Sequence, residues 1–337
     1  LEHSAHCSGC RHLTTRMSDN KRASTDSELA SKSASNSNDS SDSSASAGSS
    51  ASIASAASTD RADSKATAKS VSVEVPFIKQ TNELDCGATA LAMVFAAFGW
   101  KSALHSSTFS PFLCSELGQG NQRAVQTVSL ALVAQSFGFP CALHSVSVGF
   151  NADNAKLAYY QRYLGSDAKQ MQSQTDELMA HAKELGVELN AGELTLDALL
   201  AKLSRDSLLI VLLDWNCVLP PDKTDPDAFG YLGHFLVVVG CDANSVFVHN
   251  PGTTKRAAIQ AGACVKIARE TFDKARKATG TDQDALVIRR PLAGCEYAEQ
   301  LFEMWRANST RGHSDADDGD DDLSYDDLAR ESLYSAD

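Results

Sequence analysis

The chain has 337 residues and a formal net charge of −13, and residues 313–337 account for most of that charge, with nine Asp and one Glu against a single Arg. The rest is nearly balanced, whereas a nucleic-acid-binding domain is expected to be basic, so that class is disfavoured. The most apolar runs, at 208–213 and 235–239, are far shorter than the roughly 20 residues that cross a bilayer, so we expect no membrane span.

Low-complexity composition marks both ends of the chain. Residues 31–60 hold 14 Ser and 7 Ala, and no aromatic residue precedes Phe77. Such a segment buries too little apolar surface to offset the entropy lost on ordering. We therefore expect a disordered leader at 1–72, one globular domain at 73–292 and a C-terminal segment at 293–337 that ends in a disordered acidic tail. The negative charge of this tail would suit binding to a basic partner.

The first elements of the domain surround a cysteine. Residues 73–78 alternate apolar and polar side chains, which predicts a short strand. An apolar helical pattern then runs from 88 to 98 and ends before Gly99, a typical C-terminal glycine. Asp85 stands at the N-cap position, which places Cys86 in the first turn of this helix.

The remaining elements place helices before strands. In chain order we expect helix 125–137, strand 141–148, a pair of polar helices within 156–186, helix 196–203, strands 207–213, 232–239 and 245–249, helix 271–278 and strand 285–288. This order predicts an α+β fold, with the helix of Cys86 packed on an antiparallel sheet, rather than a doubly wound one.

Cys86 is the residue most suited to nucleophilic chemistry. A cysteine on an apolar helix is most often a buried structural thiol. At a helix N-terminus, however, the macrodipole and the free N–H groups favour the thiolate and are expected to lower the pKa of the thiol. Position therefore favours a nucleophile over a packing residue.

A thiol nucleophile also needs a base, a residue that orients the base, and donors for the oxyanion. His234 begins one apolar strand and Asn250 ends the next. A tight turn joins these strands, so antiparallel pairing brings His234 beside Asn250. Gln80, six residues before Cys86, is close enough in the chain to supply a side-chain amide. We expect Cys86, His234, Asn250 and Gln80 to form one catalytic site.

This layout resembles that of papain-like cysteine hydrolases, in which His and Asn follow the Cys by about 130–150 residues. Here the separations are 148 and 164 residues, the second slightly outside that window. The local sequence differs from papain's own motif, and residues 75–80 leading into Asp85-Cys86-Gly87 look more like the bacteriocin-processing peptidases called C39. The resemblance implies a papain-like, C39-like fold.

A more specific resemblance is to the guanylyl cyclase domain-containing protein 1 family, which includes the plant proteins named guanylyl cyclase 1. The matching phrases are Asp85-Cys86-Gly87, Tyr231-Leu232-Gly233-His234-Phe235, Asn250-Pro251, Phe272-Asp273-Lys274-Ala275-Arg276 and Gly280-Thr281-Asp282-Gln283-Asp284. They lie in order between residues 73 and 290. The last phrase separates this family from ordinary C39 peptidases.

The family name and the residues imply different reactions. The name implies conversion of GTP to cyclic GMP, which requires Mg²⁺ or Mn²⁺ held by carboxylates. Candidate carboxylates are Asp214, Asp242, Asp282 and Asp284, but the last three also suit turns, and the sequence has no phosphate-binding loop of P-loop spacing. The residues favour a thiol-dependent hydrolase of peptide or isopeptide bonds that needs no cofactor. A cyclase and a catalytically silent binding module stay open as alternatives.

Weaker signals concern metal binding, location and access. Cys7 and Cys10, flanked by histidines, form one Cys-x₂-Cys pair, which is half of the ligand set of a zinc site. The nine cysteines show no disulfide-like grid, which indicates a reducing compartment, and we expect a cytoplasmic protein with a peptide or protein substrate. Residues 218–229 read as a loop that covers a cleft. His249 should point to the face opposite Asn250 as a packing or surface residue.

Overall fold

The structure is a computed structural model that describes residues 70–117, 125–164, 167–219, 230–253 and 255–311. The expectations for the leader up to residue 69, for Cys7 and Cys10, for most of the 218–229 loop and for the acidic tail from 312 lie outside these residues. None of the described helices is long and apolar enough to cross a membrane.

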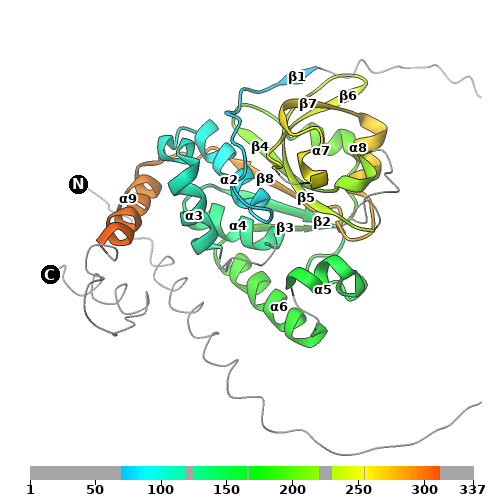
Figure 1. The fold of residues 1–337 in the computed structure, drawn as a ribbon, viewed down its shortest axis with the longest axis horizontal. Coiled ribbons are helices and arrows are strands. Elements are labelled where there is room, and N and C mark those ends of the chain that lie inside the picture. Colours follow the sequence, from blue (N-terminus) through cyan, green and yellow to red (C-terminus); the bar gives the residue numbers. More distant parts are fainter. Residues whose placement is uncertain (1–69, 118–124, 165–166, 220–229, 254, 312–337) are drawn as a thin grey trace, which may run out of the picture. The chain divides into compact units, whose positions relative to one another are not determined.

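A mixed sheet forms the centre of the described fold (Figure 1). The strands are β1 (Val71–Ser72), β2 (Cys141–Ser145), β3 (Glu188–Ala191), β4 (Ser207–Asp214), β5 (Gly233–Cys241), β6 (Ser245–Asn250), β7 (Gly262–Ala268) and β8 (Ala285–Arg289). Their order is β3-β2-β8-β4-β5-β6-β7, with β1 added to β5. All pairs are antiparallel except β2 with β3.

Helices cover both faces of this sheet. They are α2 (Cys86–Ala97), α3 (Ser106–Glu116), α4 (Thr127–Ser136), α5 (Ala158–Leu164), α6 (Ala168–Glu184), α7 (Leu196–Leu200), α8 (Arg269–Arg276) and α9 (Glu296–Arg311), with short 3₁₀ turns at Lys101–Leu104, Asn154–Lys156, Trp215–Cys217 and Lys255–Ala258. In Figure 1, α2, α3 and α4 lie on one side of the sheet, and α7 and α8 lie on the other. The expected α+β fold, with the helix of Cys86 on an antiparallel sheet, is confirmed.

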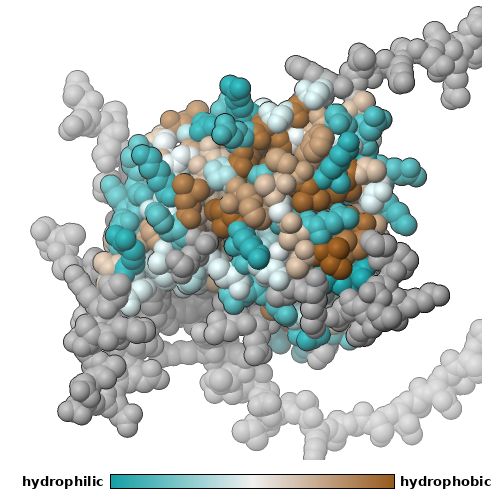
Figure 2. Space-filling view, turned by 45° about the horizontal axis from the view of Figure 1, so that its top comes forward, coloured by the Kyte–Doolittle hydropathy of each residue, from teal (hydrophilic) through white to brown (hydrophobic). Residues whose placement is uncertain are grey.

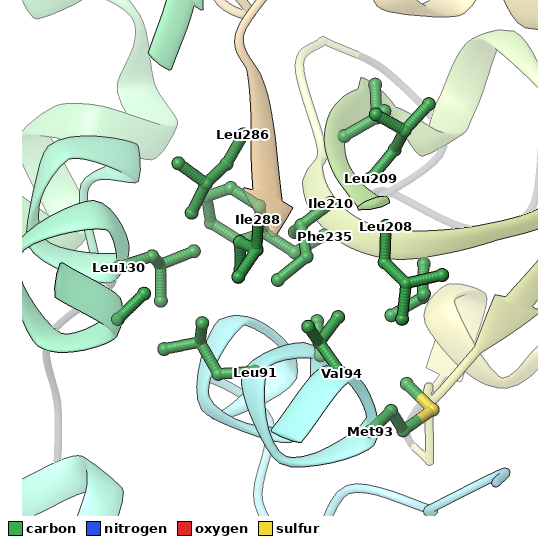
Figure 3. Packing of buried hydrophobic residues seen from close by; sticks show 14 of the residues in the cluster. Leu91, Met93, Val94, Leu130, Leu208, Leu209, Ile210, Phe235, Leu286 and Ile288 are labelled. Carbon is green, nitrogen blue, oxygen red and sulfur yellow. The ribbon is translucent and has the colours of Figure 1, made fainter. Parts of the chain in front are cut away.

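α2 is buried almost all round because it lies between the sheet and the other helices. It packs on β5, α3 and α4. Leu91 and Val94 point toward the sheet, where Ile288 of β8 and Phe235 of β5 lie (Figure 3). The helix ends at Phe98, and Gly99 takes a positive φ of 106°, a conformation that glycine adopts without strain.

The strand expected at 73–78 is wrong in its bounds. The ladder with β5 holds only Val71 and Ser72, extended by one hydrogen bond from Val73 N to Val239 O. The chain then leaves β5 and runs along β6. His249 of β6 forms a hydrogen bond with the carbonyl of Val75, and the N–H of Gln80 donates to the carbonyl of Pro251, just after β6. The alternation holds in the burial only as far as Val75, since Val73 and Val75 are buried and Glu74 is exposed, whereas Phe77, in phase with the two valines, is exposed.

The sequence reading missed α3, β3, β7 and α9. α3 contains Pro111, a residue that disfavours helix interiors, and the residues of β7 are mostly exposed, so neither shows a clear pattern. α9 lies in the segment after 292, where no ordered element was expected. It buries Phe302 against Phe109 and Phe112.

The surface is mixed in character. Figure 2 shows hydrophilic side chains over much of one face, with apolar residues between them. Such interleaving is ordinary for a folded domain, because polar atoms cannot cover the whole surface.

Candidate active site

Cys86 is the first residue of α2, and its sulfur faces the backbone N–H groups of Phe235, Gly87 and Cys86 itself. These three donors lower the pKa of the thiol, as expected at a helix N-terminus. Burial outweighs them, and the nearby Asp85 adds to it, so the pKa rises to about 11. The expected lowering of the pKa is therefore wrong, because the thiol is almost wholly shielded from water.

His234 and Asn250 form a direct hydrogen bond, 2.7 Å between Nε2 and Oδ1. Two further hydrogen bonds fix the Asn250 amide, since its Nδ2 donates to the carbonyls of Ala257 and Gln260, each at 3.2 Å. Oδ1 therefore faces the histidine and accepts its Nε2–H. The neutral imidazole then carries its unprotonated lone pair on Nδ1, which is the tautomer that a general base needs.

Trp215 shields the histidine from water. The centroids of the Trp215 and His234 rings are 5.6 Å apart, and Trp215 Nε1 donates to the carbonyl of Arg256. Both aromatic residues are buried. Burial lowers the pKa of His234 to about 4, with the Asn250 contact acting in the other direction. His234 is consequently neutral at neutral pH.

Three contacts bring the expected residues to one end of the sheet. The Cys86 sulfur faces the N–H of Phe235, the residue that directly follows His234. Asn250 contacts His234, and Gln80 N donates to the carbonyl of Pro251, the residue after Asn250. The N-terminus of α2, the start of β5 and the end of β6 thus meet here.

Gln80 supports the loop before Cys86 in this structure. Its Nε2 donates to the carbonyl of Asn82 at 2.7 Å and more weakly to that of Glu83 at 3.4 Å, while its Oε1 is buried without a hydrogen-bond partner. The amide expected to face an oxyanion is therefore turned toward the loop.

Asp85 supports the same loop from the other side. Its side chain does not cap α2; its Oδ2 instead accepts from Thr81, Asn82 and Ser110. Asp85 stands at the N-cap position as expected, but its carboxylate accepts from the preceding loop and from α3 rather than from the first turn of α2.

His249 and Asn250 have separate roles, as expected. The Nε2–H of His249 donates to Val75 O at 2.8 Å, and its Nδ1 accepts from Cys264 N at 3.1 Å. His249 is therefore a buried packing residue that fixes the segment leading to Gln80.

A pocket of about 90 Å³ lies beside this site, and the sequence reading missed it. Its walls include Tyr159, Tyr160, Tyr231 and Phe235, and its lining also contains both Asp282 and Asp284. The sequence signal is the Gly-Thr-Asp-Gln-Asp phrase at 280–284, although two aspartates in such a phrase suit a turn equally well.

Residues 75–288 match the model of a protein family described as guanylylate cyclase. The chain belongs to this family. The match contains Cys86, His234, Asn250 and the 280–284 phrase, so membership in the guanylyl cyclase family, expected from these motifs, is confirmed. No curated protein shows a significant match to the sequence.

A protein from Bacillus anthracis, described as a C39-like peptidase, is a similar solved structure. The two share 16% sequence identity, and the alignment covers 65% of this chain and 97% of that one, with a TM-score of 0.32. The resemblance to C39-like peptidases is thus found again.

The name of the guanylylate cyclase family implies GTP and a divalent metal, which the described residues do not fit. Asp214 accepts from the backbone of Asn216 and Leu232, and Asp242 accepts from the turn between β5 and β6. Across residues 70–311, apart from the gaps given above, no group of three or more His, Cys, Asp and Glu side chains is placed to hold a metal ion.

Proposed function

We propose that this member of the guanylylate cyclase family is a thiol-dependent hydrolase of peptide or isopeptide-type acyl bonds, with Cys86 as nucleophile and His234 as base. The observation that carries the proposal is the hydrogen bond between His234 Nε2 and Asn250 Oδ1. It orients an imidazole with a free Nδ1 at the strand start that the Cys86 sulfur contacts.

The reaction follows from these positions. His234 Nδ1 takes the proton of the Cys86 thiol as the sulfur attacks the substrate carbonyl, and Asn250 holds the resulting imidazolium. The C–N bond breaks, the amine leaves with that proton, and Cys86 remains as a thioester. Water, deprotonated by His234, then attacks the thioester and releases the acid and the free thiol.

Two kinds of donor are near the developing oxyanion. The N–H groups at the start of α2 already face the sulfur, and they remain available at the helix N-terminus. Gln80 is the second donor, provided that one of its amide hydrogens turns from the loop carbonyls toward the substrate. Its buried position beside Pro251 supports this role.

Guanylyl cyclase activity is the alternative that the family description favours. A triphosphate needs cationic partners as well as carboxylates that hold the metal ion. Among the described residues, no Lys or Arg lines the pocket, and no group of three or more His, Cys, Asp and Glu side chains is placed to hold a metal ion. Both observations favour the hydrolase over the cyclase. A silent binding module is the second alternative, and it predicts no turnover of either kind.

One panel of purified variants separates these functions. Wild type, Cys86→Ser and the matched control Cys295→Ala are assayed for hydrolysis of a peptide and isopeptide library, and for cyclic GMP formation from GTP with Mg²⁺ or Mn²⁺. We expect metal-independent hydrolysis that Cys86→Ser abolishes and Cys295→Ala retains, because a hydroxyl is a far weaker nucleophile than a thiol. Robust metal-dependent cyclic GMP formation by Cys86→Ser would overturn the proposal.

A further inference from the structure

The pocket lined by Tyr159, Phe235 and the two aspartates adjoins the start of β5 and the N-terminus of α2. Phe235 lines the pocket and also presents its N–H to the Cys86 sulfur. Tyr159 lines it as well, and its hydroxyl donates to the carbonyl of Gly233, the residue before His234, at 3.3 Å. A group bound in this pocket therefore lies beside the ends of β5 and α2 that carry His234 and Cys86.

Gly87 permits this close approach between α2 and the pocket wall. A Cβ at this position would lie 2.6 Å from Val125 Cγ1 and 3.2 Å from Phe235 Cδ2, and both of those residues line the pocket. The glycine that follows Cys86 thus lets the wall reach the helix start.

The pocket lining combines an apolar part with two carboxyl groups. Aromatic rings and aliphatic side chains form most of the wall, and Tyr160 stacks on Tyr231 with ring centroids 5.5 Å apart. Asp282 accepts from Asn151 Nδ2 at 2.6 Å and Asn154 Nδ2 at 2.7 Å, while Asp284 accepts from Thr127 Oγ1 at 2.5 Å. Both carboxyl groups are only partly buried, because they border the pocket.

Within the described part of the chain, no basic side chain offsets this negative charge. Among the described residues, neither Asp282 nor Asp284 forms an ion pair, and no basic residue lines the pocket. Two carboxyl groups shielded from bulk water without a counter-charge are costly, and a ligand cation relieves that cost. Each carboxylate oxygen accepts more than one hydrogen bond, so both groups still have lone pairs for a ligand.

We propose that this pocket is a specificity site that takes the cationic side chain of a substrate, a lysine-type ammonium or an arginine-type guanidinium, close to the scissile acyl bond. The aliphatic stem contacts the aromatic wall, and the charged end reaches Asp282 and Asp284. This inference rests on the proposed hydrolase function, because it assigns the substrate class of that same site.

The test uses peptidyl p-nitrophenyl esters that carry lysine, norleucine or glutamate at either of the two residues next to the ester. Acylation of Cys86 is followed by nitrophenolate release and by the mass of the intact full-length protein. At one of the two positions, we expect lysine to react about tenfold to a hundredfold faster than norleucine, and glutamate to react more slowly than both, as a charge-assisted hydrogen bond requires.

Variants of the two aspartates test whether they cause the preference for lysine over norleucine. In Asp284→Asn and in Asp282→Asn, the lysine-to-norleucine ratio should fall toward one. Asp206→Asn is the matched control, because it removes an exposed carboxylate just before β4, at the end of that strand away from the pocket residue Leu212, and it should keep the wild-type ratio. The wild-type preference is informative even where a variant fails to fold.

The outcomes distinguish the two proposals. Equal rates for lysine and norleucine, with acylation of Cys86 intact, would overturn the cation pocket and leave the hydrolase standing. Protection of Cys86 by GTP but not by lysine amide would also overturn it, in favour of a nucleotide pocket. Absence of acylation by every ester would overturn both.

Discussion

Burial sets the resting charge state of Cys86 and His234. Shielding from water raises the pKa of the thiol to about 11 and lowers that of the imidazole to about 4. Both groups are therefore neutral at neutral pH, and in the proposed reaction the proton moves to His234 during attack rather than before it. The pair differs in this respect from a thiolate–imidazolium pair that is already charged in the resting enzyme.

This neutral state predicts the pH dependence of simple alkylation. Iodoacetamide reacts with the thiolate and forms no oxyanion, so its rate at Cys86 should rise about tenfold per pH unit from pH 6 to 9. Site-resolved mass spectrometry measures the rate, with Cys86→Ala to subtract the other thiols. A plateau between pH 5 and 8 would instead reveal a preformed thiolate and contradict the neutral pair.

Asn250 and His234 should differ in the size of their effect on hydrolysis. His234→Ala removes the base and should lower kcat by about 10²–10⁴-fold. Asn250→Ala removes only the orienting acceptor, so its loss should be smaller. The ratio of kcat between the two variants is the measurement, and an equal or larger loss in Asn250→Ala would contradict the assigned roles.

At the scale of elements, the loop between Gln80 and Cys86 is held by side chains more than by backbone ladders. Asp85 Oδ2 accepts four hydrogen bonds, from Thr81 N and Oγ1, Asn82 N and Ser110 Oγ, and Asp85 is buried. The loop thereby fixes the start of α2 against α3, and with it the direction of the Cys86 side chain.

Asp85→Ala should consequently destabilise the domain by about 2–4 kcal/mol, because it leaves several buried donors unsatisfied. Asp85→Asn keeps the acceptor oxygen and should lose less. Urea unfolding of the two variants beside wild type measures the difference. Equal stability of Asp85→Ala and wild type would show that the loop does not depend on this carboxylate.

Local patterns in the sequence predicted the elements of the site, whereas contacts between distant segments were out of reach. Apolar runs and glycine stops located α2, β5 and β6, and hairpin geometry brought His234 near Asn250. Nothing local indicated that Asp282 would meet Asn151 and Asn154, more than 120 residues earlier. This turn also has two successive residues with positive φ, Asp282 and Gln283, a conformation that residues other than glycine rarely adopt. Residue propensities therefore do not predict its shape.

At the scale of the whole molecule, buried His234 and partly buried Asp284 make stability depend on pH in opposite directions. The pKa of His234 is lowered to about 4, so its contribution is present above its unfolded pKa near 6.5 and is lost as pH falls toward 4. Burial raises the pKa of Asp284 to about 7, so stability falls as pH rises from about 4 to 7 and this carboxyl ionises. Ionised Asp284 is thus a cost to the fold that a bound cation would reduce.

Asp284→Asn should therefore stabilise the domain at high pH. The gain should grow between pH 4 and 7 and reach about 2–4 kcal/mol above pH 7, since the amide accepts from Thr127 without carrying charge. Thermal unfolding at pH 5 and pH 8 measures it, with Asp206→Asn as the control for charge removal. A variant less stable than wild type at both pH values would show that the carboxylate is needed for folding.

The central claim, that Cys86 is a nucleophile activated by His234, is tested most directly by acylation at pH 7.5. Wild type, His234→Ala and the control Cys295→Ala are each reacted with a peptidyl p-nitrophenyl ester, and the acylated residue is located by mass spectrometry. The account predicts acylation at Cys86 in wild type and in Cys295→Ala, slowed about 10²-fold or more in His234→Ala. Equal acylation of Cys86 in wild type and His234→Ala would contradict it.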